Sequence, residues 1–138
     1  MKPKRLLIIG SNYKSCEVGS MFYRTAKKLN FDVEICNNST DIYAPSMKNI
    51  FGRAFYKINN KRPLEWRYFN NYIVEKINHF NPDFVLVTGI YPLKKKIFDL
   101  LKFKKVPIIN FLTDNPFVKR MKSKFFLENL ILYDLIIS

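Results

Sequence analysis

The stretch VPIINFLTDNP, residues 106–116, decides the fold that we expect for this chain. Its first part is an apolar run, as in a strand buried inside a parallel sheet, and it ends abruptly in Thr113-Asp114-Asn115-Pro116. In open α/β sheets, ligands bind just beyond the carboxyl ends of the strands. A hydroxyl, a carboxylate and an amide follow the strand at that place. We therefore predict that this loop belongs to a binding site, in which Asp114 accepts a hydrogen bond from a ligand hydroxyl or acts as a base.

A purely structural role explains the same loop equally well. Asp114 would then cap an Asx-turn that precedes Pro116 and the next helix. The two roles do not exclude each other, because a capped turn can also present its side chains to a ligand.

Apolar runs alternate with amphipathic segments along the rest of the chain. The runs predict strands at 5–10, 31–36 (near a sheet edge), 83–89, 106–112 and 134–138. Helical spacing of apolar residues predicts a first helix from between Ser15 and Ser20 to Asn30, and further helices over 47–59, 64–80, 94–104 and 118–133. Such alternation implies βαβ units. We predict one α/β domain over residues 1–138, a Rossmann-like parallel sheet of about five strands with helices on both faces.

The spacing also predicts which helical residues face the sheet. Met21, Phe22, Ala26 and Leu29 share one face of the first helix. In the last helix, the residues available for packing are Met121, Phe125, Leu130 and Tyr133.

Two other predicted strands end in small polar residues. Gly10-Ser11-Asn12 follows the first strand, where an α/β fold places a ligand-binding loop. Thr88-Gly89 ends the third strand, which we expect to neighbour the strand before Thr113. The glycine fingerprint of dinucleotide-binding proteins is absent, so a generic loop is favoured over an NAD site.

The formal net charge of +13 is compatible with an anionic membrane, nucleic acid, an acidic substrate or a mere composition bias. Between residues 48 and 68, basic side chains interleave with aromatic ones, as in a membrane-surface or polyanion patch. Helical spacing instead favours buried aromatics and solvated charges. No RNA-binding or helix-turn-helix signature is present, which disfavours nucleic acid as a partner.

The remaining composition favours a cytoplasmic chain without a metal site. Cys16 and Cys36 are predicted to be free thiols, and neither has a metal-ligand spacing. His79 lies on a predicted helix and is expected to be a satisfied or solvent-facing histidine. No apolar run is long enough to cross a membrane, so membrane contact would be peripheral, at the inner face. Because the chain stops on an apolar strand, we expect it to be the first part of a larger protein, or a natural or cloned truncation.

The order RLLIIG, FDVEIC, NPDFVLVTG, VPIINFLTDNP and YDLIIS resembles the N-terminal domain of CgeB-type (spore-maturation) glycosyltransferases, which have the GT-B architecture of two Rossmann-like domains. NPDFVLVTG looks like a strand of that family, and NFLTDNP looks like its TDDP segment with Asn115 in place of the second acid. The resemblance covers nearly the whole chain, which would be the acceptor-side half of the enzyme. By this resemblance, the donor-binding C-terminal GT-B domain would lie outside the chain.

The resemblance implies transfer of a sugar from a nucleotide-sugar donor to a hydroxyl of a sugar or glycan acceptor, without a bound metal or cofactor. The chain alone is not expected to turn over. Asp114 would be the catalytic candidate. The implied substrate-binding residues are Gly10, Ser11, Asn12, Thr88, Gly89, Thr113 and Asn115.

Two functions of other classes remain open. One is a non-enzymatic flavodoxin-like binding module, which flavin absorbance in the purified protein would support. The other is a basic protein that binds a membrane or nucleic-acid surface, for which salt-sensitive binding would be the sign.

Overall fold

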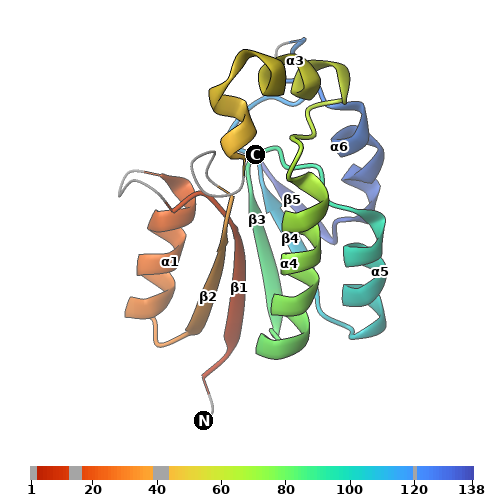
Figure 1. The fold of residues 1–138 in the computed structure, drawn as a ribbon. Coiled ribbons are helices and arrows are strands. Elements are labelled where there is room, and N and C mark those ends of the chain that lie inside the picture. Colours follow the sequence, from red (N-terminus) through yellow and green to blue (C-terminus); the bar gives the residue numbers. More distant parts are fainter. Residues whose placement is uncertain (1–2, 13–16, 39–43, 120) are drawn as a thin grey trace.

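A computed structural model describes residues 3–12, 17–38, 44–119 and 121–138. Five parallel strands form one sheet in the order β2-β1-β3-β4-β5 (Figure 1). The strands are β1 (Arg5–Gly10), β2 (Asp32–Asn37), β3 (Phe84–Thr88), β4 (Ile108–Phe111) and β5 (Leu135–Ile137). The predicted α/β fold with a five-stranded, Rossmann-like parallel sheet is confirmed, and β2 is an edge strand as expected.

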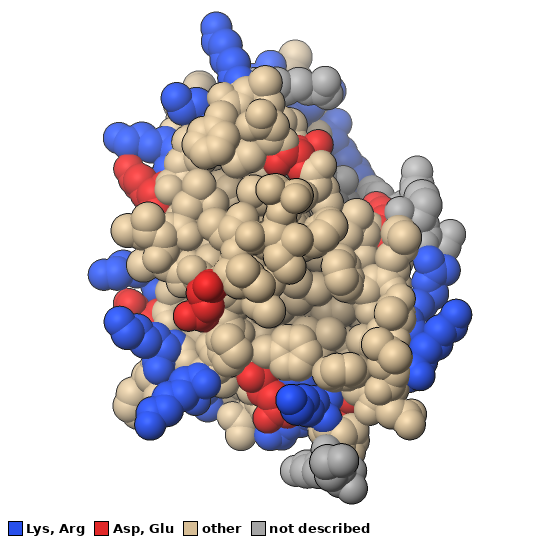
Figure 2. Space-filling model, turned by 180° about the vertical axis from the view of Figure 1, so that it is seen from behind, with Lys and Arg blue, Asp and Glu red and all other residues tan. Residues whose placement is uncertain are grey.

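Helices flank both faces of the sheet, but unequally. The α-helices are α1 (Val18–Lys28), α3 (Ile50–Ile58), α4 (Trp66–Phe80), α5 (Lys95–Phe103) and α6 (Lys124–Asn129), and the 3-10 helices are η1 (Pro45–Lys48) and η2 (Leu130–Leu132). The larger core lies on the face that α4, α5 and α6 cover. The smaller core lies between the opposite face and α1. Seen from behind, the molecule has a broad and mostly uncharged centre, with Lys and Arg gathered at its rim (Figure 2).

The inner strands are buried because both of their faces meet apolar side chains. In β1, Leu7 and Ile9 belong to the larger core, whereas Leu6 and Ile8 belong to the smaller one. This is the period of two expected for a strand, applied to a strand covered on both sides. It explains why RLLIIG is a continuous apolar run and does not alternate with polar residues.

The inward face predicted for the first helix is only partly right. Ala26 is buried and Phe22 packs against the smaller core, but Met21 and Leu29 are 52% and 65% exposed. Ser20 is no N-cap, because α1 begins at Val18 and Glu17 occupies the cap position. The other proposed cap, Ser15, lies outside the described residues. Ser20 instead donates from its hydroxyl to Asn12 Oδ1 at 2.7 Å.

The helix predicted over 118–133 is much shorter in the structure. It begins only at Lys124, because the Ser123 hydroxyl accepts from Phe126 N at 3.3 Å and caps the first turn. Before this helix, Val118 and Met121 belong to a turn, in which Met121 N donates to Val118 O at 2.9 Å. Of the residues predicted to pack, Tyr133 is buried, and Phe125 and Leu130 are partly buried against the larger core. The fully buried Phe126 was missed.

The helix predicted over 47–59 is interrupted at Asn49. Residues 45–48 form η1, and α3 starts afresh because Asn49 Oδ1 accepts from Gly52 N at 2.7 Å. The side chains of α3 do not follow the expectation that its aromatics are buried. Phe51 and Phe55 are 84% and 40% exposed. In the same basic-aromatic segment, Tyr68 of α4 is exposed too, and only Trp66 lies in the core.

Cys36 lies in the larger core, and we expect its thiol to be unreactive in the folded protein. Burial raises its pKa from an ordinary 9.0 to about 12. Below pH 9 the native thiolate population is thus about a thousandfold lower than in the unfolded chain. Because the folded-state pKa is raised, the contribution of Cys36 to stability is fully present below pH 9. It is lost as the pH rises from about 9 to about 12.

The rate of thiol labelling tests this expectation in a Cys16→Ser variant, so that Cys36 is the sole reporter. Cys16 itself lies outside the described residues. Labelling should be slow in buffer and fast in urea, and equal rates in the two solvents would show that Cys36 is not buried.

Candidate functional site

A cavity of about 300 Å³ lies at the carboxyl edge of the sheet. Because parallel strands end on the same edge, residues from distant parts of the sequence meet there. The lining residues are Ser11, Glu17, Val18, Gly19, Asn38, Thr88 and Thr113. Ser11, Asn38 and Thr113 follow β1, β2 and β4, and Thr88 is the last residue of β3. The other three lie at the start of α1. The structure thus brings three of the predicted site residues, Ser11, Thr88 and Thr113, into one cavity.

The cavity sits where the direction of strand addition reverses. The sheet extends from β1 to β2 on one side and from β1 to β3 on the other. Adjacent crossovers therefore leave toward opposite faces at β1 and β3, and open a crevice between them. The expected pairing of the strands before Gly89 and Thr113 is also confirmed, since β3 and β4 are neighbours.

Two glycines allow the backbone and hydroxyls of the site to approach closely. A Cβ atom on Gly10 would overlap Thr88 Oγ1, so the first strand and the third meet there without a side chain between them. Gly89 has φ +80°, a left-handed conformation that favours glycine, and a Cβ atom there would lie 3.3 Å from Thr113 Oγ1. Gly10 and Gly89 thus shape the cavity without lining it.

Asn12 positions the loop after β1 and does not line the cavity. Its backbone N donates to Asn37 Oδ1 at 3.2 Å, and its side-chain Oδ1 accepts from the Ser20 hydroxyl. These bonds join the ends of β1 and β2 to the first turn of α1. Asn12 therefore supports the predicted site from its side.

In the Thr113-Asp114-Asn115-Pro116 loop, different residues line the cavity and form the turn. Thr113 lines the cavity, and its hydroxyl donates to Asp114 Oδ2 at 3.1 Å. The Asx-turn exists, but Asn115 forms it and not Asp114, because Asn115 Oδ1 accepts from Phe117 N at 2.9 Å. Asp114 is exposed and stands beside the cavity, outside its lining.

Glu17 is the carboxylate of the cavity, and sequence reasoning missed it. Its Oε2 accepts a hydrogen bond from the Ser11 hydroxyl. It is the N-cap residue of α1, where the helix dipole favours negative charge. The sequence feature that could have identified Glu17 is its position just before a predicted helix, in the loop after a strand that ends in glycine. Asn38 was also missed, since it follows β2 in a loop rich in polar residues.

The polar chemistry of the cavity is acidic and neutral. Its described lining offers one carboxylate, three hydroxyls and one amide, and no Lys or Arg. Hydroxyl, amide and carboxylate groups bind the hydroxyls of a ligand, whereas phosphate groups are usually met by cations or free helix N–H groups. Over the described residues, no three His, Cys, Asp or Glu side chains lie together as a metal site.

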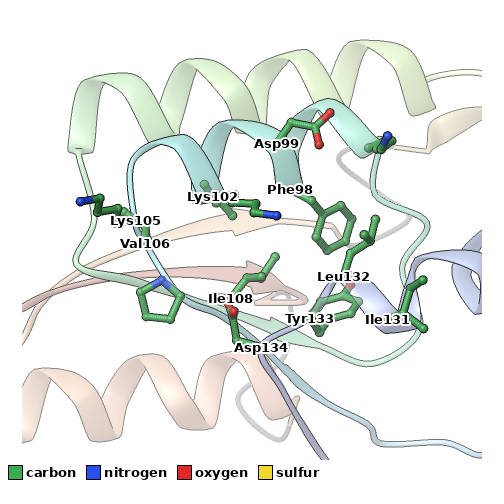
Figure 3. Close-up of a pocket in the computed structure, with 13 residues that line it drawn as sticks. Phe98, Asp99, Lys102, Lys105, Val106, Ile108, Ile131, Leu132, Tyr133 and Asp134 are labelled. Carbon is green, nitrogen blue, oxygen red and sulfur yellow. Dashed lines mark hydrogen bonds between the residues drawn. The ribbon is translucent and has the colours of Figure 1, made fainter.

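A larger cavity of about 630 Å³ runs between α5, the start of β4 and residues 131–134 (Figure 3). Phe98, Leu132 and Tyr133 form an apolar wall, and Asp134 lies beside Ile108. Asp134 Oδ2 already accepts from Ile108 N at 2.8 Å. The cavity reaches the amino end of β4, away from the edge where parallel sheets bind ligands. We therefore assign the candidate site to the smaller cavity.

Comparison with protein-family models and with curated proteins found no match to this chain. In the part of the chain that the structure describes, no helix combines the length and apolar character needed to cross a membrane.

Proposed function

We propose that this chain is the acceptor-binding, N-terminal domain of a GT-B glycosyltransferase. One observation carries the proposal: the cavity at the β1–β3 crevice joins Glu17 to the hydroxyls of Ser11, Thr88 and Thr113. This set of groups suits a sugar, whose hydroxyls both donate and accept hydrogen bonds. The sequence resemblance to CgeB-type enzymes supplies the reaction class.

In this proposal a carboxylate of the chain accepts the proton of the acceptor hydroxyl. The hydroxyl oxygen then forms a bond to the anomeric carbon of the donor sugar. The bond from that carbon to the nucleotide breaks, and the nucleoside diphosphate leaves with the bonding electron pair. We assign the carboxylate to Glu17, because it lines the cavity, and retain Asp114, next to Thr113, as the second candidate. The nucleotide sugar is the co-substrate, which the second domain of the whole enzyme would hold.

The expected result of the first test is weak sugar binding to the isolated chain at this cavity. In a two-dimensional NMR titration, glucose or N-acetylglucosamine should shift the amide signals of the loop after β1 and of Thr88 and Thr113. Glu17→Gln should weaken the binding about tenfold or more, since hydrogen bonds to charged groups are worth about 1.5–3 kcal/mol. The matched control is Glu75→Gln on the exposed face of α4.

Three outcomes would count against the proposal. The first is that sugars leave these amide signals unchanged. The second is that Glu17→Gln and Glu75→Gln have the same effect on binding. The third is transfer or hydrolysis of a nucleotide sugar by the isolated chain, which would exclude its role as half of a bipartite site.

The strand order supports a second candidate, a flavodoxin-like binding module. The order β2-β1-β3-β4-β5 is that of flavodoxin-like sheets, which bind a flavin nucleotide at the β1–β3 crevice. A six-stranded Rossmann sheet without its outer strand would have the same order, so the topology fits both candidates. The Glu17 carboxylate at the N-terminus of α1 disfavours a phosphate there. Quenching of flavin mononucleotide fluorescence by the purified chain would favour the second candidate.

A further inference from the structure

Helix α3 turns most of its apolar side chains toward solvent. Ile50, Phe51 and Ile58 are 70%, 84% and 84% exposed, and Phe55 is 40% exposed. At 100° per residue, these four fall within one arc of the helix. We call them the α3 apolar face. An amphipathic helix in a globular protein normally buries such a face, so this one is oriented the opposite way.

The other side of α3 holds the helix on the domain. Gly52 is buried, and a Cβ atom there would overlap the carbonyl oxygen of Ser46 in η1. Ser46 is fixed in turn, because its amide and hydroxyl donate to the Glu65 carboxylate at 2.9 and 2.7 Å. The outward orientation of the α3 apolar face is therefore built into the packing.

Basic side chains border this face. Arg53 and Lys57 lie one turn apart on its flank, and both are exposed, as is Lys48 before the helix. Residues 44–62 contain no Asp or Glu. Of the two acids that flank this range, Asp41 lies outside the described residues, and Glu65 is engaged with Ser46.

The segment before α6 also exposes apolar and basic side chains. The Ser123 hydroxyl donates to Asn60 O at 3.0 Å, which ties the start of α6 to the turn after α3. Just before Ser123, Phe117 and Val118 are 69% and 51% exposed. Lys119 and Lys122 in this segment are also exposed.

We infer that α3 is a peripheral docking element for an anionic lipid surface. Its apolar face would enter the interface, while Arg53, Lys57 and Lys48 meet the lipid phosphates. Charge complementarity selects this occupant. A second copy of the chain, of net charge +13, would bring like charges together. Nucleic acid would meet the basic side chains, but its phosphate backbone would leave the aliphatic side chains of Ile50 and Ile58 in water. This inference is independent of the proposed function, because α3 lines neither cavity described above.

Figure 1 shows where the docking element lies relative to the sheet. Helix α3 crosses the end of the molecule toward which the carboxyl ends of the strands point. Docking through α3 would therefore orient the carboxyl edge toward the lipid surface.

Co-sedimentation with vesicles tests the inference on the whole chain. We expect binding to vesicles of phosphatidylcholine mixed with phosphatidylglycerol, weaker binding at high salt, and little binding to phosphatidylcholine alone. The double variant Phe51→Ser/Ile58→Ser should bind anionic vesicles at least about tenfold more weakly. Both side chains are exposed, so circular dichroism and thermal unfolding should stay unchanged.

Matched control variants distinguish docking through α3 from non-specific hydrophobic binding and from binding through net charge alone. Phe103→Ser changes an 86% exposed phenylalanine on α5 and should bind like the unmodified chain. Arg53→Gln/Lys57→Gln should lose binding, while Lys27→Gln/Lys28→Gln on α1, which removes the same charge, should keep most of it.

The inference is overturned if the unmodified chain does not bind anionic vesicles, or if it binds neutral ones equally well. Equal losses in the α3 variants and their controls would also overturn it. A dimer in solution that becomes a monomer in Phe51→Ser/Ile58→Ser would assign the face to a second copy instead.

Discussion

Phe126→Ala is expected to destabilise the domain by about 3–5 kcal/mol. Phe126 is fully buried in the larger core, and the centroid of its ring lies 6.3 Å from that of Tyr133. Its backbone also belongs to the cap of α6, where Phe126 N donates to the Ser123 hydroxyl. Truncation would leave a cavity under α6 that the surrounding sheet cannot fill. Since single domains are stable by about 5–15 kcal/mol, the variant would lose a large share of its stability.

Urea unfolding followed by circular dichroism measures this effect as a lower midpoint with an unchanged slope. Phe103→Ala is the matched control, because the same side chain is removed from a position that is 86% exposed. The control should change stability by no more than about 0.5 kcal/mol. Similar midpoints for the two variants would mean that Phe126 does not pack as described.

Gly19→Ala is expected to destabilise the domain by about 1–3 kcal/mol and to deform the candidate site. A Cβ atom on Gly19 would overlap Ser11 O and lie 3.1 Å from Ser11 N and 3.2 Å from Gly10 C. These are backbone atoms, which cannot rotate away, so α1 would have to move from the end of β1. Alanine improves helix propensity by about 1 kcal/mol, but the contact with the backbone outweighs this gain. Glu17 and Ser11 would then move apart.

Thermal unfolding and the NMR signals of the loop after β1 report the two consequences separately. Thr25→Ala, at an exposed position of the same helix, should be neutral or slightly stabilising and leave those signals in place. A Gly19→Ala variant as stable as the parent, with unshifted signals at Ser11, would show that α1 does not press on the loop.

The core of the domain was largely predictable, because strand and helix periods are local properties. The apolar run RLLIIG predicted a strand, and the helical spacing placed Ala26 and Phe22 on the face of α1 that packs against the smaller core. The helical spacing of α1 also predicted that Leu29 packs against the sheet. This part was wrong because the sequence does not show at which residue the helix ends. Leu29 stands after the last turn of α1 and is exposed.

The candidate site was only half predictable. Strand ends could be recognised, so Ser11, Thr88 and Thr113 were named before their meeting place was known. Glu17 was missed, because its neighbours in the cavity, Thr88 and Thr113, are far away along the chain. Only β1–β3 and β3–β4 pairing brings these residues to one edge.

The sequence by itself determined the succession of strands and helices, the parallel sheet and the edge at which a site can form. These properties depend on side-chain periods and turn residues within short segments. The tertiary structure alone decided that Glu17, and not Asp114, lines the cavity and that α3 turns its apolar face outward. The physical reason is that helical spacing specifies which residues share a face, whereas packing against Ser46 of η1 decides which face meets the domain.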